Sequence, residues 1–258
     1  MRIAWATDLH LDFAGKKAVD RFIASVVEAK PHCLIVTGDI GEAHSWRLLL
    51  DEVSERVGKP VYFVLGNHDY YRSTIVEVRE EASRVSGWLV KSGALLLSDE
   101  VALVGHDGWG DGRLGDYANS NVMLNDYLLI GELVHANRFV RLRVLEKLGE
   151  EAADHFRQWI PTAAQRCKRI FVATHVPPFK DACWHQGGLS DSNWLPHFSC
   201  AAAGDALLAL ADEFADVEFT VLCGHMHGEG HVRMRPNLEV FTGGAEYGVP
   251  KLQRVFEV

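Results

Sequence analysis

The sequence lacks any long apolar segment. No run of apolar residues approaches the roughly 18 that a transmembrane helix needs, so we expect no membrane association. The first residues, MRIAWATDLHLD, also lack the apolar core that follows a basic start in a secretory signal peptide. We therefore expect a cytoplasmic protein.

Paired cysteines are missing as well. The five cysteines are an odd number, and no two of them have CxxC spacing. Cys33 and Cys223 fall in apolar runs that are typical of buried strands. This pattern predicts free, mostly buried thiols in a reducing compartment rather than disulfide bonds.

Basic charge is scarce relative to acidic charge. The chain has 26 lysines and arginines against 35 aspartates and glutamates, which gives a formal net charge of −9. Proteins that grip the nucleic-acid backbone usually present a basic surface. The charge therefore argues against broad nucleic-acid binding, although a local basic groove would be compatible with it.

The main pattern that is present is an alternation of short apolar runs with helical stretches. Five runs have the length of strands buried on both faces: Ile3–Thr7, Cys33–Thr37, Val61–Leu65, Ile170–Thr174 and Phe219–Cys223. Apolar stripes of helical period lie within residues 19–27, 46–57, 75–85 and 207–214. Four further runs also look like strands: Ala94–Leu97, Val101–Val104, Leu238–Phe241 and Leu252–Phe256. No long helix separates neighbouring runs, so we expect neighbours to pair as hairpins. The alternation predicts an α/β fold, in which two stacked sheets flanked by helices would hold all nine runs.

Two long irregular segments interrupt this alternation. Residues 105–131 are rich in Gly, Asp, Asn and aromatic residues, and a helix predicted from Glu132 to Ile160 follows them and ends at Pro161. Residues 177–203 form the second irregular segment. Loops of this length in a compact domain are usually functional or disordered. We expect these two to form a substrate pocket.

Each of the five buried runs ends in side chains that can bind a metal ion. In chain order these are Asp8 and His10, then Asp39, then Asn67, then His175, and finally His225 and His227. Ligands of open α/β sheets bind just outside the carboxyl ends of the strands, so these residues would converge. A GD pair or a single DxH motif can be an ordinary turn without any function. It is much harder to explain all of these motifs as ordinary turns when each one follows a buried run.

The residue types indicate which ions would bind. Carboxylates, imidazoles and one amide oxygen suit Mn²⁺, Zn²⁺ or Fe. Seven ligands are too many for one tetrahedral site and suit two sites that share a carboxylate. Glycines precede Asp39, Asn67 and His225, where the backbone would have to turn sharply and approach the site closely.

Five sequence blocks together resemble the calcineurin-like metallophosphoesterase superfamily: DLH (8–10), GDI (38–40), GNHD (66–69), THVPP (174–178) and GHMH (224–227). The resemblance implies a four-layer αββα sandwich, with two mixed β-sheets flanked by helices, around two divalent metal ions. Residues 105–160 match no motif of the superfamily and would be an inserted loop and long helix within a single domain over residues 1–258.

The resemblance also assigns roles to individual residues. One ion would take Asp8, His10 and His227, the other would take Asn67, His175 and His225, and Asp39 would bridge them. His68 would be an outer histidine that protonates the leaving alkoxide or stabilises charge on the phosphoryl group. Asp69 would orient the His68 ring through its other nitrogen.

One branch of the superfamily does not match. Its protein serine/threonine phosphatases carry arginines after the GD and GNH blocks, whereas here the segments read GDIGEAH and GNHDYY. The phosphodiesterase-like branch is therefore favoured. We expect in-line attack by a metal-activated water on a nucleotide or another small phosphate ester, with Mn²⁺ as the ion and Zn²⁺ or Fe as alternatives.

Other functions use the same residues. A nuclease for single-stranded nucleic acid would stack bases on Trp109, Trp184 and Trp194. A phosphomonoesterase would use the same metal centre. An inactive protein-binding scaffold is disfavoured because such proteins usually lose ligands, whereas all seven are present here. The motifs do not specify the oligomeric state.

Several residues outside the blocks are further candidates. His106, Asp107, Trp109, Asp111 and Arg113 would wall the substrate pocket or form a polar loop, and some of Trp184, His185, Trp194 and His197 should overhang the metals. Arg138, Arg141, Arg143 and Lys147 would bind an anionic substrate or, as the favoured alternative, form a solvated basic face. His32, His44, His135, His155 and His231 are expected to be structural or exposed.

Overall fold

The computed structural model, which describes residues 1–134 and 137–258, contains two stacked mixed β-sheets. The four-stranded sheet has the spatial order β12 (Arg254–Glu257), β1 (Arg2–Ala6), β2 (Cys33–Thr37) and β3 (Val61–Val64). The six-stranded sheet has the order β10 (Gly230–Arg235), β11 (Leu238–Thr242), β9 (Glu218–Cys223), β6 (Arg169–Thr174), β5 (Val101–His106) and β4 (Leu95–Leu96). The short strands β7 (Trp184–His185) and β8 (Gly188–Leu189) form a separate hairpin.

The centre of each sheet is parallel, and the antiparallel strands lie at the edges. Strands β1, β2 and β3 run parallel, as do β5, β6, β9 and β11. The edge strands β12, β4 and β10 pair antiparallel to their neighbours. The carboxyl ends of the parallel strands are therefore the edges at which ligand-bearing loops gather in each sheet.

Helices flank the sheets and connect their strands. They are α1 (Lys16–Glu28), α2 (Trp46–Val57), α3 (Ile75–Ala82), α4 (Leu89–Ser92), α5 (Asp126–Leu129), α6 (Arg138–Ala164), α7 (Leu195–Phe198) and α8 (Ala201–Glu213). Short 3₁₀ turns lie at Leu11–Phe13, His68–Tyr70, Gly131–Leu133 and Lys180–Ala182. No helix within the described ranges is both long enough and apolar enough to cross a membrane.

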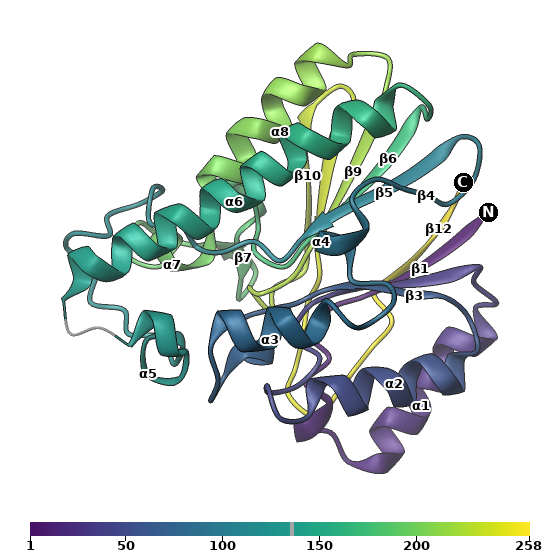
Figure 1. Cartoon of the computed structure of the whole chain (residues 1–258), viewed down its shortest axis with the longest axis horizontal. Coiled ribbons are helices and arrows are strands. Elements are labelled where there is room, and N and C mark those ends of the chain that lie inside the picture. The colour runs from purple at the N-terminus through teal and green to yellow at the C-terminus, as the bar shows by residue number, and fades with distance from the viewer. Residues whose placement is uncertain (135–136) are drawn as a thin grey trace.

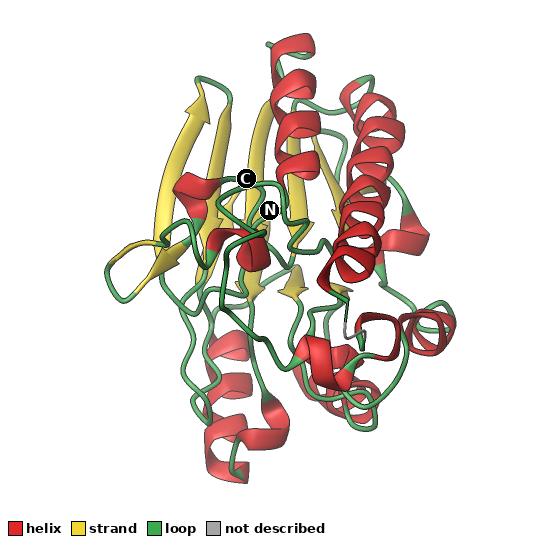
Figure 2. Ribbon diagram, turned by 90° about the vertical axis from the view of Figure 1, so that its left-hand side faces the viewer, coloured by secondary structure: helices red, strands yellow, loops and turns green. Residues whose placement is uncertain are grey.

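Alternating side chains of the strands divide the core into layers. In β1, Ile3 and Trp5 face the other sheet, whereas Ala4 and Ala6 face the helices α1 and α2. A third apolar cluster lies between the six-stranded sheet and α6 and α8. Figure 1 shows α6 and α8 side by side on one outer side and α1 and α2 on the other, with the strands between them. Seen from the side in Figure 2, the larger sheet lies against the long helices. This is the predicted four-layer αββα sandwich.

All nine predicted strands are present, but the pairing of two of them was predicted wrongly. β11 pairs with β9 and β10 in the six-stranded sheet, whereas β12 pairs with β1 in the other sheet, so the two do not form a hairpin. The apolar pattern that predicts a strand does not specify its partner. Residues 243–253 instead carry the chain from one sheet to the other.

The long helix also differs from its predicted bounds. It begins at Arg138, where the Asn137 side chain accepts hydrogen bonds from the backbone N–H groups of Phe139 (2.8 Å) and Val140 (3.3 Å) and so caps the helix. It continues past Pro161 to Ala164. Pro161 removes only one backbone donor close to the helix end, so the last turn can still form. Part of the predicted span, residues 135–136, lies outside the described residues.

Candidate metal centre

The loops after five strands bring all seven predicted ligands into one cluster. The loops after β1 and β2 are joined by the backbone, since Asp8 N–H donates to Gly38 O (3.1 Å) and His10 N–H donates to Asp39 O (2.9 Å). The two sheets are joined at the same place, where His225 N–H donates to Asp8 Oδ1 (2.9 Å). Residues more than 200 positions apart in the chain therefore meet at one edge of the sandwich.

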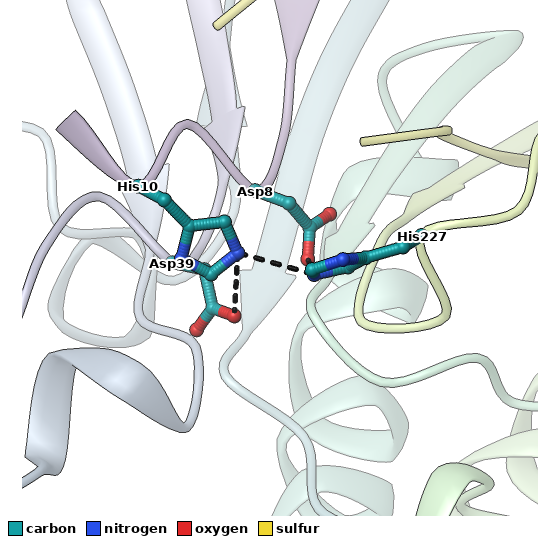
Figure 3. A group of neighbouring side chains, drawn as sticks. All are labelled: Asp8, His10, Asp39 and His227. Atoms are coloured by element: carbon teal, nitrogen blue, oxygen red, sulfur yellow. Dashed lines mark hydrogen bonds and ion pairs between the residues drawn. The ribbon is translucent and has the colours of Figure 1, made fainter. Parts of the chain in front are cut away.

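Asp8, His10, Asp39 and His227 form the first group of donors, and each offers a ligand atom within 4.8 Å of the others. Figure 3 shows these side chains directed toward a common space. His10 Nε2 lies 3.1 Å from His227 Nε2 and 3.6 Å from Asp39 Oδ2. His227 Nε2 lies 3.6 Å from Asp8 Oδ1. Two imidazoles and two carboxylates around one space are a suitable donor set for a divalent cation.

Asn67, His175 and His225 form the second group. Asn67 Oδ1 lies 3.1 Å from His175 Nε2 and 3.0 Å from His225 Nδ1. His175 Nδ1 lies 2.8 Å from the backbone oxygen of Thr37, which can only accept a hydrogen bond. In the neutral ring Nδ1 therefore holds the hydrogen, and Nε2 presents its lone pair to the Asn67 oxygen. Two electron-rich atoms facing each other fit a cation between them, and a second hydrogen bond to a carbonyl is typical of metal-binding histidines.

Asp39 lies between the two groups. Its Oδ2 is 3.6 Å from His10 Nε2, and its Oδ1 is 3.5 Å from His175 Nε2. The backbone N–H of His68 donates to Oδ1 (2.9 Å) and fixes the carboxylate in this position. The Asp39 carboxylate therefore presents one oxygen to each group of donors.

Burial makes the charged forms of these side chains unfavourable. Desolvation raises the pKa of Asp8 to about 6 and that of Asp39 to about 7. Burial, reinforced by neighbouring histidines, lowers the pKa of His10 far below its usual range, and burial likewise lowers the pKa of His225 and His227. A divalent cation would compensate the buried carboxylates and would bind the imidazoles in the neutral form that burial already favours.

The backbone at this centre is strained. Asp8 (φ 48°), His10 (41°), Asp39 (53°), His225 (68°) and His227 (56°) all adopt the left-handed region. They make up five of the eight non-glycine residues with positive φ in residues 1–134 and 137–258. Such strain costs about 1–3 kcal/mol per residue and gathers at functional sites. Its concentration on predicted ligands supports a functional role for this cluster.

Asp69 does not orient His68 as predicted. Its buried carboxylate accepts hydrogen bonds from four backbone N–H groups, those of Asp39, Ile40, Gly41 and Gly66, at 2.8–3.0 Å. Both oxygens are thus occupied, and among the described residues the carboxylate has no hydrogen bond to the His68 ring. Asp69 instead holds the loop after β2 against the loop after β3, which positions Asp39.

His68 lies over the first group of donors in an aromatic setting. Its half-buried ring packs on Tyr71, with ring centroids 4.3 Å apart, and on His10 at 4.6 Å. Its Nε2 is 3.4 Å from the hydroxyl oxygen of Tyr247, whereas its Nδ1 is buried and has no hydrogen-bond partner among the described residues. Burial lowers the pKa of this imidazole.

Asp126 is a site residue that the sequence did not reveal. Its Oδ1 accepts hydrogen bonds from Asn67 Nδ2 and from the Tyr71 hydroxyl, both at 2.8 Å. Asn67 Nδ2 also lies 3.0 Å from the Tyr71 oxygen. The orientation of the amide is thereby fixed, with its oxygen toward His175 and His225. Asp126 belongs to no block and sits in an irregular segment, so no local pattern distinguishes it.

A pocket of about 560 Å³ opens over the cluster. Both irregular segments contribute to it, as predicted for residues 105–131 and 177–203. Met123 and Asp126 come from the first, and Leu189, Trp194 and Phe198 come from the second. Tyr247, from the loop that crosses between the sheets, also lines it.

The residues at the end of β5 and in the segment just after it do not line this pocket. Asp107 accepts hydrogen bonds from Leu65 N–H (2.8 Å) and from the Tyr70 hydroxyl (2.7 Å), and so ties neighbouring elements together. Trp109 is buried against Tyr70. His106 is buried against His155, and Asp111 and Arg113 bind the N-terminus of α8 and Glu150 of α6. Of the two alternatives left open for this group, the pocket wall is wrong, because none of the five residues lines the pocket and four of them are buried.

The remaining candidates divide between the pocket and other places. His185 and Trp194 line the pocket. His197 is buried, with its Nε2 2.9 Å from Ser120 Oγ, and Trp184 packs against the segment that begins at Gly228.

The basic residues of α6 do not reach the pocket. Arg138 binds the backbone oxygens of Ala118 and Ser120, Arg141 lies over the Tyr127 ring, and Arg143 and Lys147 are exposed. His32, His44 and His231 are exposed and His155 is buried, as expected, whereas His135 lies outside the described residues.

Comparison with known proteins agrees with this geometry. The family model for calcineurin-like phosphoesterases matches residues 1–229. A transmembrane protein with a metallophosphoesterase domain from Danio rerio is 30% identical over 81 residues, which span 29% of this chain and only 18% of that protein.

Two solved structures show the same fold. One is a dimetal phosphatase from Danio rerio (TM-score 0.58, 12% identity, 95% of this chain and 87% of that chain covered). The other is a phosphopantetheinyl hydrolase from Mycobacterium tuberculosis (TM-score 0.63, 16% identity, 97% and 94% covered). The chain therefore belongs to the calcineurin-like phosphoesterase family.

Proposed function

We propose that this chain uses two divalent metal ions to hydrolyse phosphodiesters of a nucleotide or of another small organic molecule. The observation that carries the proposal is the position of Asp39, whose two oxygens face the two groups of donors at 3.6 Å and 3.5 Å. A single carboxylate between two donor groups suits a bridged pair of ions. The surrounding pocket is of a size that small-molecule sites commonly have.

The donors divide between the two ions as the sequence blocks suggest. We propose Asp8, His10 and His227 for one ion, Asn67, His175 and His225 for the other, and Asp39 for both. When bound, the two ions supply a water of lowered pKa and offset negative charge on the phosphoryl oxygens. Mn²⁺ is the proposed ion, with Zn²⁺ or Fe as alternatives, because imidazoles mixed with oxygen donors suit these metals.

His68 is the residue that we propose acts on the leaving group. Its ring lines the pocket, and its backbone N–H holds the bridging carboxylate, so it is fixed relative to the centre. Because Nδ1 is buried, Nε2 is the nitrogen that a leaving oxygen can reach. A proton held there would protonate the leaving alkoxide or stabilise charge on the phosphoryl group.

The preference for diesters over monoesters follows from the charge of the pocket. Among the described residues that line it, none is a lysine or an arginine. A monoester dianion would have to be neutralised by the metals alone, whereas a diester carries a single negative charge. This supports the phosphodiesterase-like branch that the missing arginines favour.

The nuclease alternative loses most of its support. Of the three tryptophans proposed to stack bases, Trp109 is buried and Trp184 does not line the pocket. Trp194 alone faces it, and no basic side chain of the described residues accompanies it there. A single-stranded nucleic acid would need both several stacking rings and a cationic groove.

We also propose that residues 1–258 act as one catalytic domain and that the insertion at about 105–160 serves to build the pocket. Asp126, which comes from this insertion and holds Asn67, supports that role. The five cysteines are all free and buried, which agrees with a cytoplasmic, reducing location.

The test is a substrate panel on protein reconstituted with Mn²⁺, together with elemental analysis. We expect two ions per chain and a higher kcat/KM for bis-p-nitrophenyl phosphate than for p-nitrophenyl phosphate, with little cleavage of single-stranded DNA. Asp39→Ala should lose both ions and nearly all activity, whereas His10→Ala should mainly weaken one site. A stoichiometry of one ion that excess Mn²⁺ does not change would refute the dinuclear proposal.

A further inference from the structure

The wall of the pocket that faces the metal centre is apolar and exposed. Met123 is 61% exposed, Leu189 51% and Trp194 46%. Large apolar side chains gathered at one open site usually mark a binding surface, because leaving them in water costs free energy. Here they surround the position at which a phosphate ester would react.

Two aromatic rings connect this wall to the donors. The Phe198 ring lies against His225, with centroids 4.6 Å apart, and the Tyr247 ring lies against His10 at 4.5 Å. Trp194 packs on Phe198 at 5.7 Å. The apolar surface is therefore continuous with the metal centre, so a group esterified to the reacting phosphate would contact it directly.

The charge of the pocket is acidic apart from the metals. Beyond the proposed ligand Asp39, the charged side chains in its described lining are Asp126 and Asp191. Two cations elsewhere on the surface are already paired, since Arg72 binds Glu42 (2.8 Å) and Lys251 lies 3.6 Å from Glu229. A second anionic group on a substrate would meet carboxylates here without a lysine or arginine of the described lining to balance it.

We propose that this pocket binds one uncharged group with an apolar or aromatic face beside the reacting phosphate, and that it discriminates against substrates that carry a second anion. This inference rests on the proposed phosphodiesterase function and specifies its substrate class. The volume of about 560 Å³ is sufficient for a ring-sized group in addition to the phosphate. Substrates with a further phosphate, including dinucleotides that carry a terminal phosphate, are excluded from the class.

The experiment uses two diesters that differ by one carboxylate. 4-Nitrophenyl phenyl phosphate and 4-nitrophenyl 4-carboxyphenyl phosphate share the leaving group and the reacting phosphate. With the Mn²⁺-loaded enzyme we expect kcat/KM to be at least about tenfold lower for the carboxylate, because like charges in close contact oppose binding. Calorimetric titration with diphenyl phosphate and its 4-carboxyphenyl analogue should show the same order of affinity.

Adding a positive charge to the wall tests the cause. Leu189→Lys places a cation in the exposed wall and should reduce or remove the discrimination between the two esters. Leu48→Lys, on the exposed face of α2 and outside the pocket lining, is the matched control and should leave the ratio unchanged. Trp194→Ala should lower kcat/KM for the phenyl ester more than for 4-nitrophenyl methyl phosphate, which has no ring to place on the wall.

The outcomes separate the inference from the function on which it rests. Equal kcat/KM for the two matched esters, or equal effects of Leu189→Lys and Leu48→Lys, would overturn the inference while leaving the phosphodiesterase intact. If neither ester is hydrolysed, the proposed function fails, and the titration still decides whether the pocket rejects a second anion.

Discussion

At the scale of single residues, the amide of Asn67 is the donor whose orientation depends most on a neighbour. An amide can present either oxygen or nitrogen to a metal, and only the oxygen can bind. Asp126 accepts a hydrogen bond from Nδ2 and so directs Oδ1 toward His175 and His225. Tyr71 donates to the same carboxylate oxygen and holds it in place.

Removing the Asp126 carboxylate should therefore weaken one metal site. We expect Asp126→Ala to lower the affinity for one of the two ions by about 10- to 100-fold, as is typical when a hydrogen bond to a metal ligand is lost. Calorimetric titration of the metal-free protein with Mn²⁺ measures this. Asp191→Ala removes another pocket carboxylate without a contact to Asn67 and is the control. Identical isotherms for wild type and Asp126→Ala would contradict the proposed role.

His68 should affect turnover rather than metal content. We expect His68→Ala to keep both ions and to lower kcat by about 10²–10⁴, the usual contribution of a positioned acid or base. If the residue protonates the leaving oxygen, the loss should be smaller for esters of p-nitrophenol, which leaves without a proton. Elemental analysis and rates for good and poor leaving groups distinguish the cases, and loss of an ion would show that the residue is structural.

The clustering of the proposed metal donors could be predicted from the sequence because each lies in the loop just after a strand, where the topology of the sheets fixes its position. The role of Asp69 could not, since adjacency in the chain does not tell which way a side chain points. Its carboxylate turns inward to four backbone amides instead of toward His68. Asp126 was also beyond prediction, because its partner Asn67 lies 59 positions away and only the fold brings them together.

At the scale of elements, the packing of β5 on α6 contains a buried pair of histidines. The rings of His106 and His155 lie 5.4 Å apart. Burial lowers the pKa of His106 to about 3 and that of His155 to about 4, from about 6.5 for a free imidazole. In addition, Gly108 N–H donates to His106 Nδ1 (3.2 Å), an acceptor that protonation would remove.

This pair should make the protein less stable in acid. The unfolded chain takes up a proton near pH 6.5, whereas the folded chain resists it until about pH 3–4, so stability is lost as the pH falls below 6.5. Each histidine contributes up to about 1.4 kcal/mol per pH unit across that window. Urea unfolding of metal-free wild type and His155→Gln between pH 7 and pH 4 should give a shallower pH dependence for the variant. Parallel curves would show that the buried imidazole does not control this pH dependence.

The elements differ in how well the sequence predicts them. Fully buried strands such as β2 stand out, since every residue in Cys33–Thr37 is apolar or closes the run. The edge strand β10 was not predicted, because its sequence GHVRMR alternates with exposed polar residues and has no buried run. The start of α6 is set by the Asn137 cap. The predicted start at Glu132 is too early, because several polar residues before Arg138 could equally begin a helix.

At the scale of the whole molecule, the proposed metal donors come from both sheets. Asp8, His10, Asp39 and Asn67 follow strands of the four-stranded sheet, whereas His175, His225 and His227 follow strands of the other. Metal ions bound here would link the two halves of the sandwich at one edge. Binding to the folded state alone stabilises it by about 2.7 kcal/mol when the free ion is at 100 times its Kd.

Removing the metals should therefore loosen both sheets together. Treatment with a chelator should lower Tm and increase hydrogen exchange in the loops after β1, β2, β6 and β9 by similar factors. The outer helices α1 and α8 should change little, and they serve as internal controls. If exchange increased only in the loops of one sheet, the proposed sharing of ions between the halves would be wrong.

The left-handed backbone at five of the seven proposed ligands bears on how this chain can evolve. Asp8, His10, Asp39, His225 and His227 occupy conformations in which a glycine would relieve steric strain of about 1–2 kcal/mol and lose about 0.5–1 kcal/mol in chain entropy. A homologue that no longer needs catalytic activity would thus become more stable when these residues are replaced by glycine. Each such substitution would also remove a proposed metal ligand, so a homologue with glycines at these positions is expected to lack the metal centre and its hydrolytic activity.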